Sequence, residues 1–65
     1  MTEQDLPLIP GCIVMIAAFD DVPEHSFRVE EVFEDCVTGT ALTGPLAGEH
    51  GEPDIELILR VLSTE

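Results

Sequence analysis

The stretch SFRVEEVFEDCVTGTAL, residues 26–42, decides the fold because its pattern fits both a helix and a pair of strands. Its apolar residues recur at the i, i+3, i+4, i+7 and i+8 spacing of an amphipathic helix. In that interpretation Gly39 follows the helix as its C-terminal cap. The residues at this spacing are Val29, Val32, Phe33, Cys36 and Val37.

The same stretch also alternates between apolar and polar positions, and it is rich in Val, Phe and Thr, which prefer strands. The acidic pair Glu34-Asp35 separates two such runs, as a hairpin turn would. We therefore favour two strands, at about 27–33 and 36–43, over a helix at about 28–38. This interpretation places Glu31 on the apolar face, so it requires a β-bulge near Glu30-Glu31.

Before this stretch, the chain shows one more strand and one loop. Pro10-Gly11 is a turn signal, and CIVMI at 12–16 is β-branched, which predicts a strand buried on both faces. Residues 17–26 turn acidic and contain Pro23, which favours a loop. The polar start of the chain predicts a flexible N-terminal segment over 1–9.

After residue 42, TGPLAGEHGEPD predicts a long loop over 44–54, bounded by Gly44-Pro45 and Glu52-Pro53. The following DIELILRVL is favoured as a strand over a short helix beginning at Pro53. Its alternation places one set of residues on a common face: Ile55, Leu57, Leu59 and Val61.

Four to five short antiparallel strands joined by Gly- and Pro-containing turns predict an all-β domain over 10–65, closed into a small barrel. The alternative is an α+β domain with the helix at about 28–38. The order PGCIVMI, FRVEEVFEDCVTGTAL and a closing apolar strand resembles small stand-alone SH3-like barrels over about residues 10–62. That resemblance implies an accessory subunit or adaptor. The chain has no Trp, no Tyr and no basic face, so peptide or nucleic-acid binding by such domains is not implied.

The charge is strongly one-sided: 14 Asp and Glu face 2 Lys and Arg, giving a formal net charge of −12. Such a surface repels phosphate backbones and anionic lipid, which excludes direct nucleic-acid and membrane binding. It attracts basic protein surfaces instead. The longest apolar run, CIVMIAAF, is far shorter than the roughly 18–20 residues of a membrane span. No basic region precedes it, as a signal peptide would need, so we expect a cytoplasmic protein.

No motif for catalysis or cofactor binding is present, so we expect neither an enzyme nor a cofactor. Ser26 follows His25, but neighbouring side chains on an extended chain point to opposite faces. The two cysteines, Cys12 and Cys36, lie in apolar segments, where we expect buried free thiols and not a disulfide framework.

Two acidic loops, each with one histidine, are the candidate sites. If both lie at one end of the barrel, they offer ligands to a divalent ion, although zinc and EF-hand spacings are absent and we expect no specific metal site. The metal candidates are Asp20, Asp21, His25, Glu49, His50 and Glu52. Each histidine is expected to be an exposed loop residue without a role.

The predicted function is a non-catalytic, acidic protein-interaction module that binds a basic protein surface. The alternatives are an acidic nucleic-acid mimic that inhibits a DNA- or RNA-binding protein, and divalent-metal or small-ligand binding at the two loops. A homodimer is compatible with all three, and Arg28 and Arg60 would mark its least repulsive surface if they share a face. The predicted partner contacts are Phe19, Asp20, Asp21, Glu24, His25, Glu49, His50, Glu52 and Asp54. Phe27 and Phe33 are expected in the core.

Overall fold

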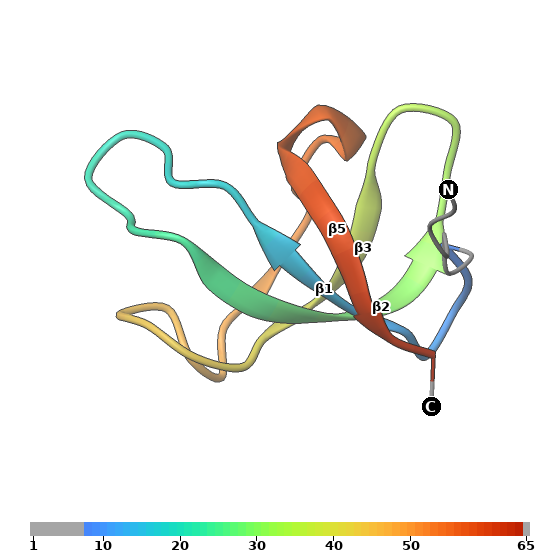
Figure 1. The fold of residues 1–65 in the computed structure, drawn as a ribbon, viewed down its shortest axis with the longest axis horizontal. Coiled ribbons are helices and arrows are strands. Elements are labelled where there is room, and N and C mark those ends of the chain that lie inside the picture. The colour runs from blue at the N-terminus through green and yellow to red at the C-terminus, as the bar shows by residue number, and fades with distance from the viewer. Residues whose placement is uncertain (1–7, 65) are drawn as a thin grey trace, which may run out of the picture.

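The computed structural model describes residues 8–64, so most of the predicted flexible segment 1–9 lies outside the described residues. Five strands and one short 3-10 helix follow one another along the chain (Figure 1). They are β1 (Ile13–Ile16), β2 (His25–Val32), β3 (Val37–Ala41), β4 (His50–Gly51), η1 (Ile55–Leu57) and β5 (Ile58–Ser63).

The strands form one antiparallel sheet with the order β4-β3-β2-β1-β5. This confirms the all-β prediction and its strand pair around residues 34–35. The alternative helix at about 28–38 is wrong, because Val29 pairs with Gly39 and Val32 with Val37 across β2 and β3. The β-branched and aromatic residues thus outweigh the helical spacing.

The sheet is not closed into a barrel, which corrects that part of the prediction. Strands β4 and β5 are the two ends of the sheet order. Strand β4 contains two residues, and Pro53, two positions beyond Gly51, has no N–H with which to extend the ladder. The chain then passes the β2–β3 turn, where Asp35 accepts a hydrogen bond from the Ile55 amide, before β5 pairs with β1.

A bulge interrupts β2, as the sequence predicted. The register shifts between Val29 and Glu31, so that Glu30 and Glu31 occupy two positions of β2 against a single step of β3. The extra residue keeps both glutamates exposed and returns Val32 to the core side. An unbroken alternation would have directed the Glu31 carboxylate into the core.

The core lies on one face of β1, β2 and β3. Every second residue of β1, of β3 and of β2 up to Val29 is buried, as expected for a sheet with one covered face. The fully or nearly fully buried apolar residues are Cys12, Val14, Ile16, Phe27, Val29, Val37 and Ala41. Leu8 packs against this cluster from the start of the described chain.

Two predictions about strands are wrong, one about the burial of β1 and one about the extent of the last strand. Strand β1 is buried on one face only, since Ile13 and Met15 are partly exposed between Val14 and Ile16. The segment after Asp54 does not run as one strand, because η1 comes first and β5 then pairs with β1 through two register shifts.

The predicted loop 44–54 contains part of a hairpin. Strand β4 lies inside it and pairs with β3, His50 opposite Thr40. The connection from β3 to β4 is fixed to β2 by side-chain hydrogen bonds: Thr43 Oγ1 accepts from the Ser26 amide at 3.0 Å and lies 3.2 Å from Ser26 Oγ. The turn therefore has a defined position beside the start of β2.

The face of the sheet opposite the core carries both arginines. Arg28 pairs with Ile13 and Arg60 pairs with Met15, and paired residues present their side chains on the same face. Ile13 and Met15 share that face because they are two residues apart on β1. Neither arginine forms an ion pair within residues 8–64.

Candidate functional site

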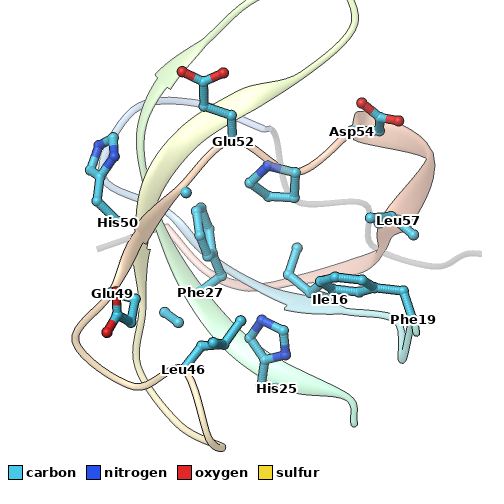
Figure 2. Close-up of a pocket in the computed structure, with 13 residues that line it drawn as sticks. Ile16, Phe19, His25, Phe27, Leu46, Glu49, His50, Glu52, Asp54 and Leu57 are labelled. Carbon is cyan, nitrogen blue, oxygen red and sulfur yellow. The ribbon is translucent and has the colours of Figure 1, made fainter. Parts of the chain in front are cut away.

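A pocket of about 340 Å³ opens between the β1–β2 loop, the β3–β4 hairpin and η1. Figure 2 shows its lining, which draws on segments far apart in the sequence. Both candidate loops contribute to it, and both lie on the same side of the molecule in Figure 1. The lining residues are Ile16, Phe19, His25, Phe27, Ala41, Leu46, Glu49, His50, Gly51, Glu52, Pro53, Asp54 and Leu57.

Apolar side chains form the floor of the pocket. Ile16 and Phe27 come from the inner face of β1 and β2, where strand alternation directs them toward the core side. Leu46 and Leu57 are half-buried and pack against the core from the hairpin and from η1. Because β4 and β5 do not meet, this apolar surface stays open at one end.

Carboxylates stand at the margin of the pocket. Glu49, Glu52 and Asp54 flank the short strand β4, and all three are exposed. Figure 2 shows them around the apolar side chains and not among them. Their charged oxygens therefore remain in contact with water, so the carboxylates do not incur the free-energy cost of burying a charge.

His25 is 4% exposed and begins β2, which corrects its prediction as an exposed loop residue. Its Nδ1 lies 2.9 Å from the Pro23 carbonyl oxygen, and its ring is 6.3 Å from that of Phe19. A carbonyl oxygen can only accept, so Nδ1 carries the hydrogen, and Nε2 of the neutral ring presents a lone pair. No described residue is bonded to Nε2, and none of the described side chains has a buried unpaired nitrogen. Nε2 therefore keeps access to solvent, beside the pocket that His25 lines.

His50 turns its ring to the outside of the pocket (Figure 2), in agreement with its predicted exposure. Its Nε2 lies 3.6 Å from Glu30 Oε1, with 59% and 50% of the two side chains exposed. Thr40 Oγ1 donates to the other oxygen of the same carboxylate at 3.3 Å. A pair this exposed contributes little to stability, and the position of β4 is set by its backbone pairing with β3.

The structure brings six of the nine predicted contact residues to this one pocket: Phe19, His25, Glu49, His50, Glu52 and Asp54. Asp20, Asp21 and Glu24 do not line it and are exposed in the β1–β2 loop. Phe19 is partly buried there and pairs with Val22 in a short bridge across the loop.

The metal candidates do not gather into a binding cluster. Within residues 8–64, no three His, Cys, Asp or Glu side chains stand close enough together to hold an ion. His50 is turned to Glu30, and Asp20 and Asp21 lie outside the pocket that His25 lines. No arrangement of the described side chains supports the metal alternative.

The sequence did not indicate which apolar residues would line the pocket. Ile16, Phe27 and Leu57 have the pattern of core residues, and nothing local distinguishes a core side chain from one at an open edge. Leu46 carried a signal, since it is the lone large apolar residue within the polar turn TGPLAGEHG. An isolated leucine between turn residues indicates a contact with a distant part of the chain.

The lining of the pocket includes neither Phe33 nor either cysteine. Phe27 is buried as predicted, but Phe33 is 50% exposed, because β2 ends before it and the chain turns away from the core. Both cysteines are free; Cys12 is buried, but Cys36 is only half-buried. Desolvation raises the pKa of the Cys36 thiol, and the negative charges of Glu52, Asp35 and Asp54 raise it further.

Comparison of the chain with protein-family models, curated proteins and solved structures found no match. Within residues 8–64, no helix is long and apolar enough to cross a membrane.

Proposed function

We propose that this chain is a non-catalytic, acidic protein-interaction module, an accessory subunit or adaptor that binds a basic surface of another protein in the cytoplasm. The observation that carries the proposal is one apolar pocket between the β1–β2 loop and the β3–β4 hairpin, with the carboxylates of the segment around β4 at its margin. An interface needs an apolar centre and a polar rim, and this pocket offers both.

The net charge of −12 supports a basic partner. A field of this sign accelerates the approach of a positive surface and rejects other acidic proteins. The strand order β4-β3-β2-β1-β5, with a 3-10 helix before the last strand, supports an SH3-like arrangement of the sheet. In this proposal the open end between β4 and β5 is the binding surface.

Capture from native lysate with two charge-matched baits tests the proposal. The first bait carries Glu49→Gln and Glu52→Gln at the pocket margin, and the second carries Glu34→Gln and Glu56→Gln away from it. We expect one basic protein to be retained by the unchanged chain and by the second bait, lost from the first, and released by high salt. The captured protein, once purified, must bind the chain directly. Equal retention by all three baits, or no retained protein, would contradict the proposal.

No specific observation favours the two alternatives. A nucleic-acid mimic needs carboxylates spaced like phosphates along one face, whereas the acidic side chains stand in the β1–β2 loop and in the β2–β3 turn on the opposite side of the molecule (Figure 1). Metal binding lacks a cluster of ligands among the described residues.

A homodimer is a further part of the proposal. The face with Arg28 and Arg60 is where a second copy meets the least repulsion, because it carries both of the chain's arginines. Light scattering after size exclusion measures the mass directly. Screening by salt should favour the dimer, and a monomer at both low and high salt would contradict this part.

A further inference from the structure

We infer that the pocket accepts a single basic side chain, lysine or arginine, from the partner, with its aliphatic stem on the apolar floor and its cationic head between His25 and the marginal carboxylates. The inference rests on the proposed function and specifies its contact. Lysine and arginine side chains combine an apolar stem with a charged end in this way.

The size and lining of the pocket fit such an occupant. Its volume of about 340 Å³ is at the lower end of ligand pockets, enough for one long side chain with water. Ile16, Phe27, Leu46 and Leu57 offer the apolar contact for a stem. An acidic occupant would be repelled by the marginal carboxylates, whereas a cationic end group would be attracted by them.

The acceptor geometry determines the chemistry of the head group. His25 lines the pocket, and its Nδ1 is occupied by the Pro23 carbonyl oxygen, so Nε2 is the ring nitrogen left to contact an occupant. Glu49, Glu52 and Asp54 are also acceptors when ionised. The polar groups at the pocket therefore favour a hydrogen-bond donor with positive charge, such as an ammonium or guanidinium group.

Gly51 provides a way to fill the pocket without disturbing the fold. It pairs with the buried Gly39, so a side chain at position 51 would stand on the inner face of the sheet. A Cβ at Gly51 meets nothing within 4 Å, and its backbone is the extended one of β4. The Gly51→Leu variant should fold, and its leucine side chain should fill the pocket. Thr64→Leu is the matched control, because it adds the same side chain at an exposed position outside the lining.

The test measures binding of short Gly/Ser peptides to the purified chain by calorimetry at neutral pH. All peptides carry the same flanking charges from 2,4-diaminobutyric acid, a lysine analogue two methylenes shorter, and differ only in the central residue. Central lysine or arginine should bind about tenfold more tightly than central diaminobutyric acid, from the additional buried methylenes. Central norleucine, which has the stem without the charge, should bind at least as weakly as central diaminobutyric acid.

Variants of the protein test whether the preference for a central lysine arises at the pocket. Gly51→Leu should abolish the preference for lysine, whereas Thr64→Leu should keep it. Glu49→Gln with Glu52→Gln should weaken lysine binding by about tenfold, the loss of charge-assisted contacts, and Glu34→Gln with Glu56→Gln should have a smaller effect.

Three outcomes would overturn the inference, and they are distinguishable from failure of the proposed function. Equal, salt-sensitive binding of the lysine and diaminobutyric acid peptides means attraction by the general field, so the pocket inference fails while a basic partner remains. A lysine preference that persists in Gly51→Leu places the side chain elsewhere. If no peptide binds, the inference fails as well, and the capture experiment decides the proposed function separately.

Discussion

Gly39 has no room for a side chain. It lies at the inner face of β3, where a Cβ would collide with the Arg28 carbonyl oxygen and approach Phe27 Cε1 to 2.8 Å. The obstacle includes backbone, which cannot move aside as a flexible side chain would. The glycine therefore sets how closely β2 and β3 approach one another next to the bulge.

Replacement of Gly39 by alanine should destabilise the fold by about 3 kcal/mol, because it overpacks this contact. A core of this size supplies only about 3–5 kcal/mol, so the variant should retain no more than about 2 kcal/mol of stability. Urea denaturation followed by circular dichroism measures the change. Gly51→Ala is the matched control in the paired position, where a Cβ meets nothing and stability should change by less than about 0.5 kcal/mol. Equal midpoints for the two variants would contradict the steric account.

Cys36 should be a slow nucleophile. Its thiol pKa is raised by desolvation and by the carboxylates of Glu52, Asp35 and Asp54, so little thiolate is present near neutral pH. Alkylation by iodoacetamide, followed by mass spectrometry of the Cys36 peptide, should have a higher pH midpoint in the folded chain than in urea. Glu52→Gln should lower that midpoint, and identical midpoints in folded and unfolded chains would disprove the shift.

The sign of the linked stability follows from the same pKa. Between the unfolded and the folded pKa of Cys36, the folded chain retains a proton that the unfolded chain has lost. This group's contribution to stability is therefore complete below the unfolded pKa and decreases as the pH rises toward the folded value. Cys36→Ser should remove that part of the alkaline loss of stability.

At the scale of elements, the start of β5 departs from the predicted alternation, although Val61 packs against the core as that alternation predicts. Ile58 pairs with Ile16 and packs against the core, whereas Leu59 is 47% exposed. The 3-10 helix before β5 and the register shifts within its pairing cause this difference, since each changes the count of residues along the strand.

Alanine substitutions distinguish the two arrangements. Ile58→Ala should lower the free energy of unfolding by about 2 kcal/mol, the lower end of the loss for an isoleucine packed in a core, because Ile58 is only partly buried. Leu59→Ala should change it by no more than about 0.5 kcal/mol, as for an exposed position. Chemical denaturation of both variants measures the difference, and a larger loss for Leu59→Ala would restore the original alternation.

The elements show how much the sequence predicted. The strands of residues 26–42 and the bulge at Glu30-Glu31 were predictable, because residue preference and alternation are local and the misplaced Glu31 signalled the bulge. Strand β4 was not, because its two residues have no pattern of their own and pair only where β3 offers free hydrogen-bonding groups. The two loops of the candidate site were predicted as segments, but the pocket between them depends on contacts that no local pattern contains.

For the whole molecule, the net charge of −12 should make stability depend on salt. The carboxylates repel one another in the compact state, and salt screens that repulsion. The thermal midpoint should rise by about 5 °C between low and moderate salt, at about 10 mM and about 300 mM NaCl. Differential scanning calorimetry measures it, and a flat or falling midpoint would count against strain from charge.

The sequence by itself determined the strand-forming segments, the acidic field and the positions of the two loops, because these follow from residue type and local spacing. Only the tertiary structure decided that the sheet stays open, that His25 is buried beside a pocket, and that Arg28 and Arg60 share a face. The physical reason is register: one additional residue in a strand, or a strand of two residues, changes which side chains meet across the sheet.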